Sequence, residues 1–169
     1  IQLVVENLNI DGQYTFIVLQ EHIDKYNIDK MLRLIKPDCN IVITDGITEG
    51  AASTTLLAKE FIDNENPLVI ANSDQYFEWN PREVIYSFMN KSIDGGILTF
   101  PSTHPKWSYA KIDELGNVVE VAEKNPISNH ATVGVYGWTH GSEYVASAEE
   151  MIDNTISVNN CFDGCQVYS

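Results

Sequence analysis

The chain has 169 residues, of which 44% are hydrophobic and 10% aromatic, and this is enough for one domain with an apolar core. Ten basic residues against 24 acidic ones give a formal net charge of -14, which argues against nucleic acid and anionic membrane surfaces as partners. The sequence has no apolar run long enough to cross a bilayer and no signal-peptide pattern, so we expect a cytoplasmic protein.

The first half of the sequence alternates strand-like apolar runs with segments of helical periodicity. Helices are predicted over residues 1–8, 28–35, 53–62 and 80–89, and strands over 14–20, 41–43 and 67–71. In the helix over 53–62, Ser53 is the predicted N-cap. Its core-facing stripe is predicted to be Leu56, Leu57, Phe61 and Ile62. Repeated alternation of strand and helix favours a parallel, three-layer sheet.

The second half is richer in strands. Strands are predicted over residues 96–100, 109–113, 118–123 and 133–138, followed by a helix over 142–152. Residues 114–117, Glu-Leu-Gly-Asn, have the composition of a hairpin turn, so part of this half is antiparallel. We therefore predict a single α/β domain over residues 1–169, Rossmann-like and mostly parallel, with antiparallel additions.

The third predicted strand ends abruptly in polar residues. Four apolar residues after Pro67 suit a strand covered on both faces, and Asn72, Ser73 and Asp74 follow directly. Open α/β sheets bind ligands at the carboxyl ends of their strands. A carboxylate at that edge is placed to hold a divalent cation, which in turn holds phosphate oxygens.

Two other segments have chemistry suited to an anionic ligand. In the run from Thr48 to Thr54, small residues around Gly50 allow close approach to the backbone at a helix start. In the run from Ala122 to Pro126, Lys124 can hold a phosphate while Glu123 accepts hydrogen bonds from sugar hydroxyls.

Each of these segments also has an ordinary structural explanation. Single aspartates after strands are common turn formers, and a small-residue turn with a serine N-cap is a usual way to begin a helix. Neighbouring glutamate and lysine side chains are frequent on protein surfaces. The order of the segments along the chain is more specific than any one of them.

That order resembles the sugar-phosphate nucleotidyltransferases, the nucleotide-sugar pyrophosphorylases of the thymidylyltransferase type. The matching segments cover nearly the whole chain with preserved spacing. They are Thr-Glu-Gly-Ala-Ala at 48–52, Ala-Asn-Ser-Asp-Gln at 71–75, Pro-Lys-Trp-Ser-Tyr at 105–109, Glu-Lys-Asn-Pro-Ile-Ser at 123–128 and Ala-Thr-Val-Gly-Val-Tyr at 131–136.

The resemblance implies transfer of a nucleotidyl group from a nucleoside triphosphate to a sugar 1-phosphate, with Mg²⁺ as cofactor and loss of pyrophosphate. The product would feed the synthesis of polysaccharides or other glycoconjugates. By resemblance, Asp74 would bind the catalytic magnesium and Lys124 the sugar phosphate. The other implied contacts are to the nucleotide at Glu49, Gly50, Ala51, Asn72 and Ser73, and to the sugar phosphate at Ser108, Glu123, Thr132 and Gly134.

Two parts of the family pattern have no match here. The glycine-rich signature, with the arginine and lysine that grip the triphosphate, lies before the helix with which this chain begins. We therefore expect a domain truncated at its N-terminus, with the C-terminus as a second candidate point of truncation. Asp163 and Ser169 are the candidates for the family's second metal ligand.

Other functions stay open. The chain could be a non-catalytic module that binds nucleotide sugars and regulates a partner, or a glycosyltransferase on a similar sheet, and it could form a homo-oligomer. Of the three cysteines, Cys39, Cys161 and Cys165, no set has the spacing of a zinc site, and reduced thiols are expected. The four histidines have no Ser or Cys partner at a recognisable spacing, which argues against a hydrolase triad.

Overall fold

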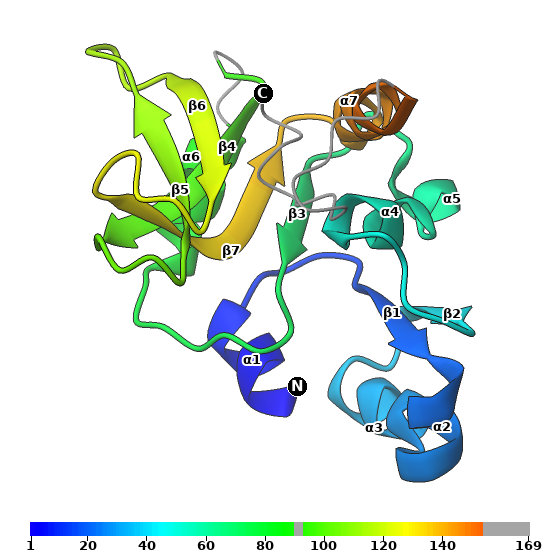
Figure 1. The fold of residues 1–169 in the computed structure, drawn as a ribbon. Coiled ribbons are helices and arrows are strands. Elements are labelled where there is room, and N and C mark those ends of the chain that lie inside the picture. Colours follow the sequence, from blue (N-terminus) through cyan, green and yellow to red (C-terminus); the bar gives the residue numbers. More distant parts are fainter. Residues whose placement is uncertain (90–92, 154–169) are drawn as a thin grey trace.

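Two β-sheets organise residues 1–89 and 93–153, the part of the chain that the computed structural model describes (Figure 1). The smaller sheet contains β1 (Thr15–Leu19) and β2 (Asn40–Thr44), which are parallel, with Thr15 opposite Asn40. All strand pairs of the larger sheet are antiparallel. Its strands are β3 (Leu68–Ala71), β4 (Gly95–Pro101), β5 (Ser108–Ile112), β6 (Val118–Glu123) and β7 (His130–Trp138).

Strand β7 lies at the centre of the larger sheet. It pairs with β3 at its C-terminal end, with β5 at Ala131, and with β4 from Gly95 opposite Trp138 to Pro101 opposite His130. Residues 131–138 of β7 are all buried, as a run rich in valine and aromatic residues requires in a strand covered on both faces.

Helices cover both faces of this sheet, and alternate side chains of β7 point to opposite faces. Tyr136 and Trp138 pack with residues of three helices, α4 (Ala51–Leu56), α5 (Lys59–Ile62) and α7 (Gly141–Asp153). Val133 and Val135 pack with residues of α1 (Gln2–Leu8) and α6 (Pro81–Phe88). The larger sheet is therefore the middle of three layers. The helices α2 (Gln20–Tyr26) and α3 (Ile28–Ile35) connect β1 to β2.

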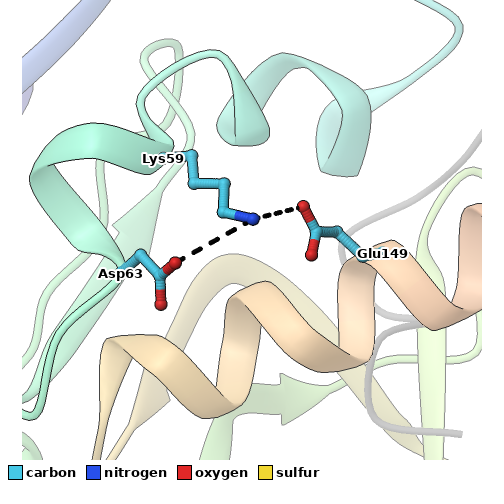
Figure 2. A network of polar contacts seen from close by, with 3 residues as sticks. All are labelled: Lys59, Asp63 and Glu149. Carbon is cyan, nitrogen blue, oxygen red and sulfur yellow. Dashed lines mark hydrogen bonds and ion pairs between the residues drawn. The ribbon is translucent and has the colours of Figure 1, made fainter.

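Lys59 on α5 forms ion pairs with Asp63 and with Glu149 on α7 (Figure 2). Its Nζ lies 2.6 Å from Glu149 Oε1 and 3.9 Å from Asp63 Oδ2, and the hydrogen bond to Glu149 raises the pKa of Lys59. All three side chains are close to half exposed, so solvent weakens these ion pairs. These ion pairs therefore contribute little to the stability of the fold.

The start of α7 comes very close to the loop that follows α5. The Gly141 amide donates to Asn66 O and the Ser142 amide to Asn64 O, both at 2.9 Å. A Cβ at position 141 would lie 2.0 Å from Ile62 O, so only glycine permits this approach.

The predicted helix over 53–62 is wrong in its boundaries. The structure has two helices there, the first begins after Gly50 rather than Ser53, and tighter hydrogen bonds from Leu57 to Thr54 and from Ala58 to Thr55 separate them. This turn shifts the helical phase, so Leu57 and Phe61 are exposed, while Ile62 is buried and Leu56 partly buried. No helix is predicted over residues 20–26, where α2 lies.

The mixed α/β class is confirmed, with a larger antiparallel share than expected. The alternation of strand and helix favours a parallel sheet, and β1 and β2 are parallel, but β3 pairs antiparallel with β7. The predicted hairpin between β5 and β6 is confirmed. Within residues 1–89 and 93–153, no helix is long and apolar enough to span a bilayer.

Candidate functional site

The loop that carries Asp74 leaves the end of β3 at the surface. The four residues of β3 are partly buried, whereas Asn72, Ser73 and Asp74 are exposed. The Asn72 amide donates to Gly134 O on β7 at 2.9 Å. The first residue of the loop is thereby fixed to the central strand, and the Asp74 carboxylate is accessible to solvent two residues later.

A side chain from α1 holds the far part of the same loop. Asn7 donates through Nδ2 to Phe77 O at 2.9 Å and accepts from the Phe77 amide through Oδ1 at 3.3 Å. The Trp79 indole N–H donates to Asn7 O at 2.9 Å. Beside these contacts lies a groove of about 450 Å³, lined by α1 and the segment 76–81. Sequence reasoning missed Asn7, because its partners lie 70 and 72 residues away.

The predicted sugar-phosphate residues come from three adjacent strands. Ser108 on β5 is directly opposite Glu123 on β6, and the next residue, Tyr109, is opposite Ala131 on β7. Thr132 follows Ala131 and is 5% exposed. The register therefore brings residues far apart in the sequence into neighbouring positions.

Glu123 and Lys124 interact where β6 ends. Glu123 Oε1 lies 2.7 Å from Lys124 Nζ, and the two side chains are 15% and 67% exposed. Glu123 Oε2 is buried and has no hydrogen-bond partner among the described residues. A buried acceptor without a donor is costly, and a ligand hydroxyl would supply the missing hydrogen bond.

The backbone of Lys124 has an unusual conformation. Its φ is 51°, in the left-handed region that few non-glycine residues adopt, and its amide donates to Trp107 O at 3.0 Å. Such conformations are found disproportionately at binding and catalytic sites. The hydrogen bond to Trp107 holds the backbone of Lys124 beside the residue that precedes β5.

One path across the larger sheet connects the two groups of residues. The strand order of the larger sheet is β6, β5, β7, β3. Glu123 lies on β6, Ser108 on β5, and Thr132 and Gly134 on β7, and Gly134 O accepts a hydrogen bond from the Asn72 amide at the start of the Asp74 loop. The sheet itself therefore links the predicted sugar-phosphate residues to the predicted metal ligand.

The predicted nucleotide-binding turn belongs to another part of the fold. Gly50 O accepts from the Thr48 and Thr54 hydroxyls at 3.1 and 2.9 Å, which closes the turn before α4. Glu49 and Ala51 flank it, and α4 packs on α7. In the part of the chain that the structure describes, no hydrogen bond joins this turn to Asp74, and its contact with a nucleotide stays a prediction.

Asp74 and its two predecessors carry side-chain oxygens directly after β3. No group of three or more His, Cys, Asp or Glu in residues 1–89 and 93–153 is arranged to hold a metal ion. A single carboxylate fits Mg²⁺, which is commonly held by one or two carboxylates together with substrate phosphates. Cys39 is buried and free. Cys161, Cys165, Asp163 and Ser169 lie outside the described residues.

Comparison with known structures identifies similar folds. A nucleoside-diphosphate-sugar pyrophosphorylase from Vibrio cholerae RC9 matches with a TM-score of 0.74 and 21% identity, over 94% of this chain and 67% of that protein. A candidate glucose-1-phosphate thymidylyltransferase from Bacillus anthracis, solved with a sucrose, matches with a TM-score of 0.66 and 17% identity, over 94% of this chain and 62% of that protein. The inositol-1-phosphate CTP transferase from T. maritima matches with a TM-score of 0.69 and 13% identity, over 98% of this chain and 63% of that protein.

At these identities the structural likeness shows the fold alone, and the chain spans about two thirds of the length of each of these proteins. No curated protein sequence matches the chain. The family model described as nucleotidyl transferase matches residues 1–160, nearly the whole length. The resemblance drawn from the order of the motifs is confirmed, and the chain belongs to the nucleotidyl transferase family.

Proposed function

We propose that this chain contributes most of a domain that transfers a nucleotidyl group from a nucleoside triphosphate to a sugar 1-phosphate. The observation that carries the proposal is the path of residues from Glu123 and Lys124 across the sheet to Asp74. The family and the three similar folds support it. We further propose that the protein is cytoplasmic and that its product feeds polysaccharide or other glycoconjugate synthesis.

The reaction joins two anions. A phosphate oxygen of the sugar 1-phosphate attacks the α-phosphorus of the triphosphate, and the bond to the β-phosphate breaks with release of pyrophosphate. Repulsion between the phosphates is the main obstacle, and cations that neutralise it stabilise the transition state without a covalent intermediate. The chain must therefore supply positive charge locally, against its net charge of -14.

Some of these residues recognise the sugar, and others neutralise the charge of the phosphates. Glu123 Oε2 accepts a hydrogen bond from a sugar hydroxyl, and the Lys124 ammonium, 67% exposed, binds the sugar phosphate. Asp74 would hold Mg²⁺, with oxygens of Asn72 and Ser73 close by in sequence. Bound there, the metal ion would screen the phosphate charges. Ser108, Thr132 and Gly134 form the wall beside the sugar.

We propose that the complete catalytic domain includes residues beyond these 169. Among residues 1–89 and 93–153, β1 pairs only with β2 and β3 only with β7, so one edge of each strand has no strand partner there. The apolar residues of both strands are only partly buried, which is less cover than such runs usually receive in an α/β sheet. An added strand would satisfy these edges, and the similar proteins are longer chains.

The test is ligand-dependent thermal stabilisation of the full gene product. With Mg²⁺ and a panel of nucleotide sugars, we expect at least one to raise the melting temperature, because a ligand that binds only the folded state stabilises it. Asp74→Asn should remove the part of this shift that depends on Mg²⁺. Asp38→Asn makes the same change in charge at an exposed turn and should leave the shift intact.

A second assay separates the functions that the sequence left open. Release of pyrophosphate from a nucleoside triphosphate and a sugar 1-phosphate identifies the transferase. Stabilisation without pyrophosphate release, in the full gene product, identifies a regulatory module instead. Transfer of sugar from a nucleotide sugar to an acceptor identifies a glycosyltransferase. If no nucleotide sugar stabilises the protein and Asp74→Asn changes nothing, the proposed function is wrong.

A further inference from the structure

Strand β7 is irregular where it passes the end of β3. Its pairing with β4 moves from Ile97 opposite Tyr136 to Thr99 opposite Thr132, so two steps along β4 correspond to four along β7. Gly134 lies in this irregular stretch with a φ of 73°. Bulges of this kind bend a strand and redirect its neighbours, and they are frequent beside active sites.

The Asn72 side chain occupies the space that a side chain at position 134 would need. A Cβ there would lie 2.3 Å from Asn72 Nδ2, 2.7 Å from Cγ and 3.1 Å from Cβ. The Asn72 amide also donates to Gly134 O at 2.9 Å. Both the backbone and the side chain of Asn72 therefore contact Gly134, whose φ favours glycine, and a side chain at position 134 would displace that of Asn72.

We propose that Gly134 is a positioning residue that acts through Asn72 on the direction of Asp74. Asn72 is exposed, and both its backbone amide and its side chain contact Gly134. Asp74 is only two residues further along the chain, and its place depends on how the loop leaves β3. The inference rests on the proposed function only for what Asp74 binds, since the coupling between positions 134, 72 and 74 is a property of the fold.

The experiment compares Gly134→Ala with a matched glycine. Gly116→Ala, in the turn between β5 and β6, also places alanine at a positive φ of 87°, but a Cβ there meets nothing within 4 Å. The two variants share backbone strain, and only the first displaces Asn72. The backbone amide signals of Ser73 and Asp74 in NMR spectra of the full chain should shift in Gly134→Ala and stay in place in Gly116→Ala.

The dependence on Asn72 is tested by a double variant. Asn72→Ala removes Nδ2 and Cγ and leaves only the contact at 3.1 Å. We expect Asn72→Ala to shift the Asp74 amide signal by itself, and Gly134→Ala to add little in that background, because neighbouring sites in one network are not additive. If Gly134→Ala does not fold, Asn72→Ala still tests the inference. Asn72 is exposed, so its replacement by alanine should leave the fold intact.

Metal affinity gives a second readout, with Mn²⁺ as the probe and electron paramagnetic resonance of the free ion as the measurement. Loss of positioning should weaken Mn²⁺ binding about 10- to 100-fold in Gly134→Ala, as is typical when groups that orient a metal ligand are removed. Gly116→Ala should bind as the unaltered chain does. If the unaltered chain binds no Mn²⁺, the proposed role of Asp74 as a metal ligand is wrong. The amide signals then still show whether positions 134, 72 and 74 are coupled. Asp74 signals that stay unmoved in both Gly134→Ala and Asn72→Ala would overturn the inference.

Discussion

The Phe88 ring occupies the space beside two glycines that face each other across β4 and β7. Gly96 is opposite Gly137 in the register. A Cβ at position 137 would lie 2.2 Å from Cδ2 and 2.9 Å from Cβ of Phe88, and one at position 96 would lie 2.7 Å from Cδ1. Phe88 is 6% exposed and is the buried residue of α6, with Val84 and Ile85 partly buried in the same cluster.

Gly137→Ala is therefore expected to destabilise the fold. Carbon atoms in contact prefer about 3.5–4.0 Å, so the ring must move by more than about 1 Å. Rotation of the ring alone does not solve the clash, because Phe88 Cβ, close to the backbone of α6, is also too near. Overpacking of this kind costs about 1–3 kcal/mol in the free energy of unfolding. Phe88→Ala leaves a cavity and should cost about 3–5 kcal/mol.

Urea unfolding followed by tryptophan fluorescence measures these free energies of unfolding. The slope of the free energy against urea concentration should stay unchanged, which checks that unfolding remains two-state. Gly12→Ala is the control, because a Cβ there meets nothing within 4 Å, and it should stay within about 0.5 kcal/mol of the unaltered chain. The double variant of positions 88 and 137 should cost less than the sum of the two single ones. A Gly137→Ala chain as stable as the Gly12→Ala chain would refute the reasoning.

Two further predictions concern loops. Asn7→Ala removes both hydrogen bonds to the Phe77 backbone and should cost about 1–3 kcal/mol in urea unfolding, whereas Gln2→Ala, at the exposed start of the same helix, should cost less than about 0.5 kcal/mol. Hydrogen bonds from the Asn117 side chain, then from its amide, lower the pKa of Asp113 below its ordinary value. Its stabilising contribution is therefore present above the unfolded-state pKa and lost as pH falls through the lowered folded pKa. Asn117→Ala should raise the pKa of Asp113 in an NMR titration, and equal titration curves for the two chains would contradict this explanation.

Local patterns predicted most elements because helices and strands depend on residues close in the sequence. The helix α3, closed before Pro37, and the hairpin between β5 and β6 are examples. The apolar residues over 53–62 fit a single helical period and so predict one helix. A tight turn at Leu57 and Ala58 interrupts that period, and no proline or glycine marks it.

The site was harder to predict than the elements. The family resemblance supplied its residues, and the sheet register that brings Ser108 and Thr132 together depends on pairings distant in sequence. Alternation of strand and helix favoured a parallel partner for β3, whereas β7 pairs with it from the opposite direction. Gly134 did carry a usable signal, since a glycine inside an apolar strand often marks a bulge. Nothing near Asn7 in the sequence points to its role.

The close approach at Gly141 occupies amide groups that the start of a helix can otherwise offer to an anion. The first amides of a helix are ordinarily a ready receptor for phosphate, since they point outward at the positive pole of the helix dipole. At α7, the longest helix in the described residues, carbonyl groups of Asn64 and Asn66 already accept two of these donors. These two amides are therefore bonded within the protein, and in the proposed function the attraction of a sugar phosphate would depend on cationic side chains such as that of Lys124.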